Sequence, residues 1–196
     1  MRIVSGKYKA RHFDIPRNFK ARPTTDFAKE NLFNILNNII DFEDCAVLDL
    51  FSGTAGISLE FLSRGCAPVI SVEMDSLHYS HQRKIHAKLQ DKNWIPLRDD
   101  VFRFVRRDSR KYDIIFADPP YLLKELNTIP DLIFEHNLLK EDGIFIFEHG
   151  KDYDFSQHPM FMRHVSYGSV NFTIFTANSQ DNGNRNNSEE QRMTQK

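Results

Sequence analysis

Short apolar runs alternate with longer amphipathic stretches along most of the chain from residue 45 onward. An apolar run of about four to eight residues between turn signals predicts a buried strand, and apolar residues spaced about three or four apart predict a helix. We therefore expect strands and helices in regular alternation. The expected strands are residues 45–51, 68–75, 94–100, 112–120 and 143–150, and the expected helices are residues 56–65, 76–90, 101–107 and 126–139.

Both ends of this alternating region carry further elements. Apolar and polar residues alternate over residues 2–15 around the turn signal Ser5–Lys7, which predicts a small N-terminal β-hairpin. The stretch after Pro23 has helical spacing, and residues 163–176 predict two more strands around Tyr167–Ser169. Apolar strands that alternate with helices are typical of a mostly parallel sheet with helices on both faces. The prediction is a Rossmann-like α/β fold around a seven-stranded sheet.

Composition divides the chain into three segments. We expect a basic hairpin extension over residues 1–22, one folded domain over residues 23–177, and a tail over residues 178–196. The tail has almost no apolar residues, so it cannot bury a core and is predicted to be disordered.

The overall composition indicates a soluble globular protein, with 40% hydrophobic and 27% charged residues in a chain of 196. No apolar run approaches the roughly 20 residues that span a bilayer, and the N-terminus lacks the apolar centre of a secretion signal. Two cysteines are too few for a disulfide framework. We expect a cytoplasmic monomer without a membrane partner.

Charge is unevenly distributed, although the net charge is only −1. Residues 1–22 are rich in Lys and Arg, and Asp14 is their single acid. Such a local surplus can form a surface for nucleic-acid phosphates while the whole protein stays neutral. A second basic group lies at residues 103–111, where a solvated helix face explains the charges equally well.

Several of the predicted strands end in residues suited to a ligand, and ligands of open parallel sheets bind beyond the carboxyl ends of the strands. The first strand leads into the glycine-rich turn "DLFSGTAG" at Asp49–Gly56, where glycines let backbone amides approach a ligand closely. Glu73 ends the second strand at the spacing of an acid that binds ribose hydroxyls. Asp100 follows the third strand and can accept from an exocyclic amine. Together these positions favour a ligand that contains ribose and adenine.

The fourth strand ends in "DPPY", Asp118–Tyr121, which fixes a carboxylate at the strand tip. Pro119 and Pro120 cannot extend the sheet, and a residue before proline is held extended. The carboxylate of Asp118 and the carbonyl of Pro119 can accept both N–H groups of an exocyclic amine and so aim its lone pair at a methyl donor. Tyr121 can stack on a base that has left its helical stack. An NAD-dependent oxidoreductase explains neither this motif nor the lack of G-x-G-x-x-G in the first turn.

The motifs "DLFSGTAG", "VEMD", "RDDVFRF" and "DPPY" resemble those of class I S-adenosylmethionine-dependent methyltransferases that modify exocyclic amines. "MRIVSGKYKAR" followed by "RPTTDFAKENLFNIL" is similar to the bacterial RsmD family, and the resemblance covers about residues 1–176. It implies methyl transfer from S-adenosylmethionine to the N2 amine of one guanine in 16S ribosomal RNA, with S-adenosylhomocysteine as product. It also implies the small ribosomal subunit as partner and no metal.

Carried over by position, the resemblance assigns roles to three groups of residues. The methionine end of the cofactor would be lined by Asp49, Phe51, Gly53 and Thr54, its ribose would be bound by Glu73, and its adenine by Asp100 and Val101. The guanine would be held by Asp118, Pro119 and Tyr121. Two residues, Arg22 and Thr24, would lie over the site. The phosphates of the RNA would be bound by Arg2, Lys7, Lys9 and Arg11.

One position departs from the family pattern, because the family usually has glycine where this chain has Ala55, and a small residue where it has Gly56. This shift puts loop geometry and cofactor affinity in question. Two enzymatic alternatives share the DPPY motif, namely methylation of adenine N6 and of glutamine N5. A non-catalytic RNA-binding assembly factor is a third alternative, against which the intact Asp118 argues.

Other polar residues fit ordinary structural roles. His78, His81 and His86 fall on one predicted helix but lack the H-E-x-x-H pattern of a metal site, so surface positions are expected. Glu148 and His149 follow the fifth strand, where a contact with the substrate and an ordinary strand end are both open.

Overall fold

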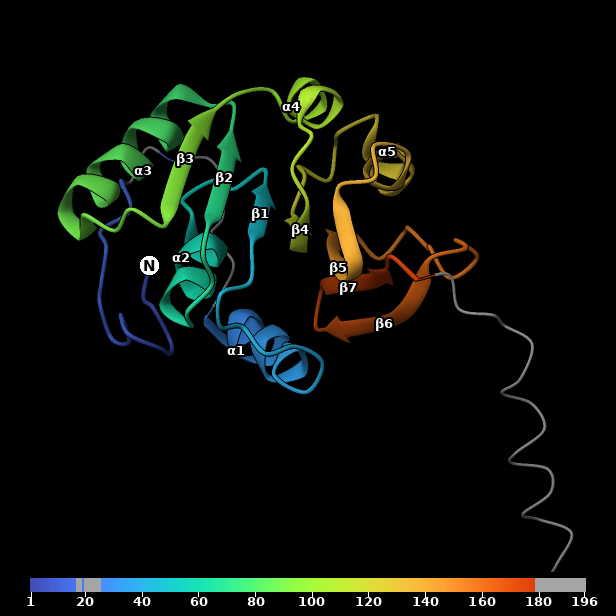
Figure 1. Ribbon diagram of the computed structural model, residues 1–196, viewed down its shortest axis with the longest axis horizontal. Helices are drawn as coiled ribbons and strands as arrows, with labels where there is room; N and C mark the ends of the chain where they lie inside the picture. Colours follow the sequence, from blue (N-terminus) through green and yellow to red (C-terminus); the bar gives the residue numbers. More distant parts are fainter. Residues whose placement is uncertain (17–18, 20–25, 179–196) are drawn as a thin grey trace, which may run out of the picture.

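The computed structural model describes residues 1–16, 19 and 26–178. These residues form a seven-stranded sheet with helices on both faces (Figure 1). Arg22, Thr24 and residues 179–196 of the predicted tail lie outside the described residues. Within the described ranges, no helix is long and apolar enough to cross a membrane.

The sheet is mixed rather than fully parallel. Its strands are β1 Val47–Leu50, β2 Val69–Glu73, β3 Trp94–Arg98, β4 Tyr112–Ala117, β5 Leu139–His149, β6 Phe161–Tyr167 and β7 Val170–Thr176. Their order across the sheet is β3-β2-β1-β4-β5-β7-β6, and β7 runs antiparallel to both of its neighbours. The chain order reverses between β1 and β4, and ligands bind at such a switch point in open α/β sheets. The predicted seven-stranded α/β sheet is confirmed, with its last two strands as an antiparallel hairpin.

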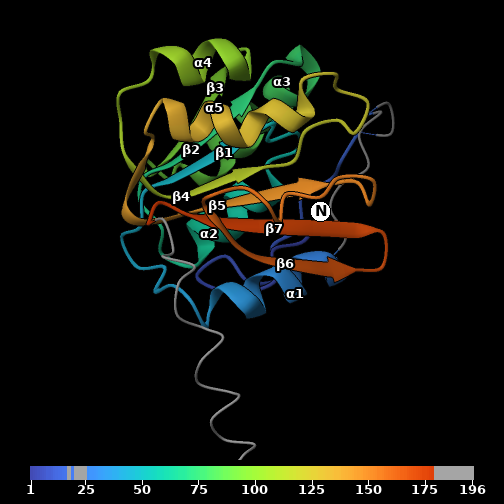
Figure 2. The same cartoon turned by 90° about the vertical axis from the view of Figure 1, so that its right-hand side faces the viewer.

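The sheet divides the apolar interior into two cores, and helices cover it on both sides (Figure 2). Their bounds are α1 Asp26–Leu36, α2 Gly56–Ser63, α3 Ser76–Leu89, α4 Val101–Arg107, α5 Ile129–Glu135 and the 3-10 helix η1 Leu126–Thr128. Phe61 of α2 packs in one core with residues of α1 and α3, and Phe104 of α4 packs in the other with residues of α5. Both faces of the sheet are thereby covered.

The helix predicted over residues 126–139 is shorter and divided. Pro130 lies in the first turn of α5, where its missing N–H costs no intrahelical hydrogen bond. Helix α5 ends at Glu135, and β5 begins at Leu139, which was the last residue of the predicted helix. The helix between β4 and β5 is therefore short, and β5 begins earlier than its apolar run indicates.

The predicted N-terminal hairpin is present as a short antiparallel pairing, in which backbone hydrogen bonds join residues 1–3 to residues 10–13. The structure has one isolated antiparallel bridge, between Arg2 and His12. The loop between them turns to α2, where the N–H of Lys7 donates to the carbonyl of Ser63 at 2.7 Å. Gly6, with φ of 77°, approaches so closely that a Cβ there would lie 1.8 Å from the Ser63 oxygen. The loop at the tip of the hairpin is therefore fixed on α2 through its own backbone.

Candidate active site

The carboxyl ends of β1, β4 and β5 bring three acids to one edge of the sheet, namely Asp49, Asp118 and Glu148. Ala117 of β4 pairs with Phe147 of β5, so Asp118 and Glu148 are the next residues on two adjacent parallel strands. Burial raises the pKa of all three carboxyls, to about 7 for Asp49, and the charge of Asp118 adds to the shift at the other two. Three neighbouring carboxyl groups that repel one another are typical of a binding site, because a cationic or hydrogen-bond-donating ligand would stabilise their charged forms.

The turn after β1 is anchored from both sides. Asp49 is 1% exposed and accepts a hydrogen bond from the Ser58 hydroxyl of α2. Thr54 is buried as well, and its Oγ1 lies 3.8 Å from the sulfur of Met1. Both predicted cofactor residues therefore lie in the interior of the turn rather than on its outer surface.

Left-handed backbone conformations make this turn compact. Phe51, Gly53 and Ala55 have φ of 59°, 50° and 63°. A left-handed conformation is ordinary for glycine but costs an alanine about 1–2 kcal/mol. Ala55 thus adopts the conformation that glycine favours, and α2 begins at the next residue. The departure from the family pattern is accommodated by backbone strain at Ala55.

Glu73 ties the turn to the end of β2. Its Oε2 accepts the N–H of Gly53 and its Oε1 accepts the N–H of Asp75, each at 2.7 Å. Gln82 of α3 completes the support, since its amide donates to the carbonyl of Gly53 at 2.8 Å and to the Ser52 hydroxyl at 2.9 Å. Each carboxylate oxygen can accept more than one hydrogen bond. The carboxylate of Glu73 therefore keeps lone pairs for further donors while it holds the turn.

Asp100 and Val101 lie at the start of α4, as the strand-end prediction requires. Asp100 caps this helix, because its Oδ1 accepts the N–H of Arg103 at 2.8 Å. The ring of Phe102 contacts that of Phe51 edge to face, with centroids 6.4 Å apart. The turn after β1 and the start of α4 are thus adjacent, and the capping contact leaves Oδ2 of Asp100 for a further hydrogen bond.

The DPPY corner brings Tyr121 against Glu148, a residue whose role the sequence left open. The Tyr121 hydroxyl donates to Oε1 of Glu148 at 3.1 Å, and the tyrosine is 42% exposed. Glu148 is only 5% exposed, and its Oε2 has no hydrogen-bond partner among the described residues. Pro119 is buried and Asp118 partly buried beside them. The sequence feature that could have identified Glu148 is its position. It is an acid near the carboxyl end of β5, the strand that pairs with β4, and Asp118 directly follows β4.

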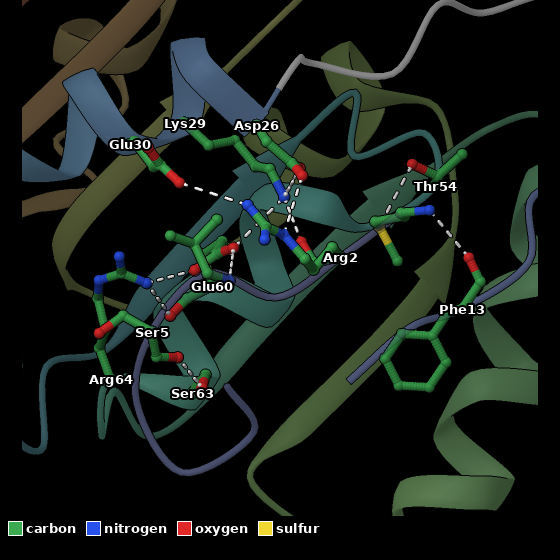
Figure 3. Close-up of polar contacts among 12 residues, drawn as sticks. Arg2, Ser5, Phe13, Asp26, Lys29, Glu30, Thr54, Glu60, Ser63 and Arg64 are labelled. Carbon is green, nitrogen blue, oxygen red and sulfur yellow. Dashed lines mark hydrogen bonds and ion pairs between the residues drawn. The ribbon is translucent and has the colours of Figure 1, made fainter. Parts of the chain in front are cut away.

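A buried ion pair fixes the basic N-terminal segment to α1 and α2 (Figure 3). Nζ of Lys29 lies 3.3 Å from Oε1 of Glu60, and neither side chain is more than 2% exposed. Lys29 also donates to the carbonyl of Arg2 at 2.5 Å, and Glu60 accepts the N–H of Val4 at 2.7 Å. Both buried charged groups therefore form hydrogen bonds with the backbone of the N-terminal segment. These bonds compensate for the burial of the charges and hold the segment in place.

The basic side chains of this segment contact different parts of the molecule. Lys7 pairs with Asp91 at 2.9 Å, in the turn that precedes β3 and therefore at the amino edge of the sheet. Lys7 and Arg11 both lie over the ring of Tyr8, at 5.1 and 5.0 Å. Arg2 instead binds acids of α1. Among the predicted RNA-binding residues, Lys7 and Arg11 thus lie together and Arg2 lies elsewhere.

One histidine is not where the sequence indicated. His81 is buried rather than on the surface, because Phe19 of the N-terminal segment packs against its ring, with the two ring centroids 5.4 Å apart. Across the described ranges, no group of three or more His, Cys, Asp or Glu side chains is arranged to hold a metal ion.

The strand order, the antiparallel β7 and the row of strand-end acids define an α/β methyltransferase fold. The solved structure of yhhF from Escherichia coli superposes with a TM-score of 0.80 at 26% identity, over 92% of this chain and 99% of that chain. An RNA methyltransferase from Salinibacter ruber in complex with S-adenosyl-L-homocysteine shares the fold, with a TM-score of 0.61 at 17% identity over 80% of this chain and 94% of that chain.

The chain belongs to the RsmD family, whose model, described as Conserved hypothetical protein 95, matches residues 1–176. YlbH of Bacillus subtilis (strain 168) is 30% identical over 185 residues, which are 89% of this chain and 98% of that protein. The ribosomal RNA small subunit methyltransferase D of Escherichia coli (strain K12) is 30% identical over 148 residues, 76% of this chain and 74% of that enzyme. The predicted family is confirmed.

Proposed function

We propose that this protein transfers a methyl group from S-adenosylmethionine to the exocyclic N2 amine of a guanine in 16S ribosomal RNA. The names of its relatives, ribosomal RNA small subunit methyltransferase D, support the substrate class. The observation that carries the chemistry is Asp118, a carboxyl fixed by two prolines at the tip of β4 with Tyr121 beside it. The small ribosomal subunit is the proposed partner.

The strand-end residues fit this cofactor. Glu73 would hold the ribose with the lone pairs that its two backbone contacts leave over, and Asp100 and Val101 would hold the adenine. When bound, the cofactor supplies an electrophilic methyl group on a positively charged sulfur. The buried carboxyls of Asp49 and Asp118, whose pKa values burial raises, place compensating negative charge where a cationic ligand stabilises it.

The protein's own part in the reaction is to position the amine. The carboxyl of Asp118 and the carbonyl of Pro119 accept its two N–H groups, which turns the nitrogen lone pair toward the methyl group. The half-exposed ring of Tyr121 offers a face on which the base stacks. Rigid placement of these groups is what the two prolines supply.

Transfer of labelled methyl to unmodified small ribosomal subunits tests this function. Nucleoside digestion and mass spectrometry should find the label in N2-methylguanosine at one site. Label in N6-methyladenosine would support methyl transfer to an exocyclic amine but identify adenine, not guanine, as the substrate. If no label is transferred, the proposed function is wrong.

A pair of variants tests the assigned role of Asp118. Asp118→Ala should abolish methyl transfer, because the amine loses its carboxylate acceptor, and leave RNA affinity within about threefold. Asp142→Ala, an exposed position on β5, is the matched control and should behave as wild type. Loss of RNA binding together with activity in Asp118→Ala would contradict the role.

A further inference from the structure

Glu148 is a buried carboxyl with an unused oxygen. Its side chain is 5% exposed, and Tyr121 provides a hydrogen bond to Oε1 at 3.1 Å. Oε2 is buried and has no partner within the part of the chain that the structure describes. A buried polar atom without a partner destabilises a fold, so such an atom in a native protein calls for an explanation. A hydrogen-bond donor carried by the substrate is one that fits its place.

The position of Glu148 is set by strand register. Ala117 and Phe147 pair across parallel strands, and such strands lie about 4.8 Å apart. Asp118 and Glu148 follow these residues directly, so both leave the sheet on the same face. Burial and then the charge of Asp118 raise the pKa of Glu148, which is the electrostatic sign of this proximity. The groups around Glu148 are thus the ones that would hold the target base.

We propose that Glu148 selects guanine by accepting the N1–H of the base on Oε2, while Asp118 accepts an N–H of the adjacent N2 amine. This inference rests on the proposed function. Guanine carries these two donors on neighbouring atoms of one edge, so two adjacent carboxyl groups match it. The Tyr121 hydroxyl keeps the carboxyl of Glu148 turned toward that edge.

The same arrangement rejects the other amines that DPPY enzymes modify. Adenine presents its N1 as an acceptor beside the N6 amine, so Oε2 of Glu148 would face a lone pair and both atoms would stay unpaired. A glutamine side chain has no second donor next to its amide nitrogen. Sites built to pair a substrate N–H reject analogues that lack it far more strongly than apolar pockets reject a missing methylene.

The decisive experiment varies the enzyme and the base together. Small subunits are reconstituted with a synthetic RNA segment that carries either guanine or 2-aminopurine at the target position. 2-Aminopurine keeps the amine at C2 but has an unprotonated N1. The ratio of kcat/KM for the two RNAs is measured for wild type, Glu148→Ala, Glu148→Gln and the exposed control Glu141→Gln.

At a pH above the raised pKa of Glu148, about 8, where its carboxyl is ionised and cannot donate to an unprotonated N1, wild type should prefer guanine by about 100-fold or more. Glu148→Ala should lower kcat/KM for guanine by about 10- to 100-fold and change that for 2-aminopurine by less than about threefold. Glu148→Gln should raise the rate on 2-aminopurine, because its amide N–H can donate to the unprotonated N1. S-Adenosylmethionine affinity and melting temperature, measured in parallel, show whether each variant is folded.

The outcomes separate this inference from the function on which it rests. Parallel losses on both RNAs would make Glu148 a structural residue and overturn the inference alone. A wild-type protein that methylates neither RNA would overturn the proposed function, and the role of Glu148 with it. If Glu148→Gln inverts or strongly reduces the preference for guanine over 2-aminopurine, the result supports both the proposed function and the role of Glu148.

Discussion

The backbone N–H of Gly53 donates to Oε2 of Glu73 at 2.7 Å, which joins the turn after β1 to the end of β2. The second oxygen of the same carboxylate accepts the N–H of Asp75 at 2.7 Å. Together with Gln82, this side chain therefore holds the glycine-rich turn in position before any ligand binds. A loop that is already in place loses less conformational entropy on binding, so this contact favours cofactor affinity.

Glu73→Gln should weaken both the fold and cofactor binding. The substitution keeps the shape but turns one acceptor oxygen into an NH2 donor, which then faces a backbone N–H. An unpaired buried donor costs about 1–3 kcal/mol, so the free energy of unfolding should fall by about this amount and the cofactor Kd should rise about tenfold. Thermal unfolding and calorimetric titration measure the two effects. Exposed Glu141→Gln is the control, and a Glu73→Gln variant that matches it would contradict the role.

Ala55→Gly should stabilise the protein slightly and leave cofactor affinity unchanged. The left-handed conformation at φ of 63° costs alanine about 1–2 kcal/mol, whereas glycine gives back about 0.5–1 kcal/mol through its more flexible unfolded chain. Ala87→Gly, in the exposed face of α3, is the matched control and should destabilise by about 1 kcal/mol. A rise in affinity above about tenfold in Ala55→Gly would mean that alanine distorts the loop.

The location of the strand-end acids was predictable from the sequence because parallel strands share one carboxyl edge. Asp49, Glu73, Asp100 and Asp118 each follow an apolar run, and topology alone then brings them to one edge of the sheet. The role of Glu148 stayed open, since its use depends on the register between β4 and β5, which no single-strand pattern contains.

The contacts of the N-terminal segment were less predictable than its hairpin. Its alternating pattern predicts the pairing of residues 1–3 with residues 11–13, and the structure has this pairing. Its contacts with Glu60 and Ser63 of α2 depend on the tertiary fold, which a local pattern does not contain. The same segment covers His81, whose burial therefore could not be inferred from the pattern of α3 alone.

Basic residues of the N-terminal segment should differ in their contribution to RNA binding. Each phosphate contact that is lost reduces the salt dependence of RNA affinity by about one unit of slope. Lys9→Ala should show this loss, because Lys9 is exposed and has no ion pair in the described ranges. Lys7→Ala should show a smaller one, since Asp91 already neutralises Lys7. RNA Kd measured from about 50 to about 200 mM salt tests both, and equal slopes for the two variants would contradict the difference.

The buried acids should make the protein less stable as pH rises. Burial raises the pKa of Asp118 and Glu148 in the folded state, whereas unfolded Asp and Glu titrate near about 4. Between these values the folded state binds more protons than the unfolded state, so the free energy of unfolding falls with increasing pH. Glu148→Gln removes one of these groups and should flatten the decline by up to about 1.4 kcal/mol per pH unit.

Denaturant unfolding between about pH 5 and about pH 8 measures this slope. Glu141→Gln should follow the wild-type curve, because Glu141 is exposed. A Glu148→Gln curve parallel to wild type would show that Glu148 ionises as freely in the fold as in the unfolded chain.

Tyr121 has two separable roles, and two substitutions distinguish them. Tyr121→Phe keeps the ring for stacking and removes the hydrogen bond to Glu148, so kcat/KM should fall by about three- to tenfold. Tyr121→Ala removes the ring as well, and a lost base–aromatic stack of about 1–3 kcal/mol should lower kcat/KM by about 100-fold in total. Methyl transfer to small subunits gives both values. Equal losses in the two variants would assign the whole effect to the hydroxyl, and a Tyr121→Ala variant as active as wild type would exclude a stacking role for this ring.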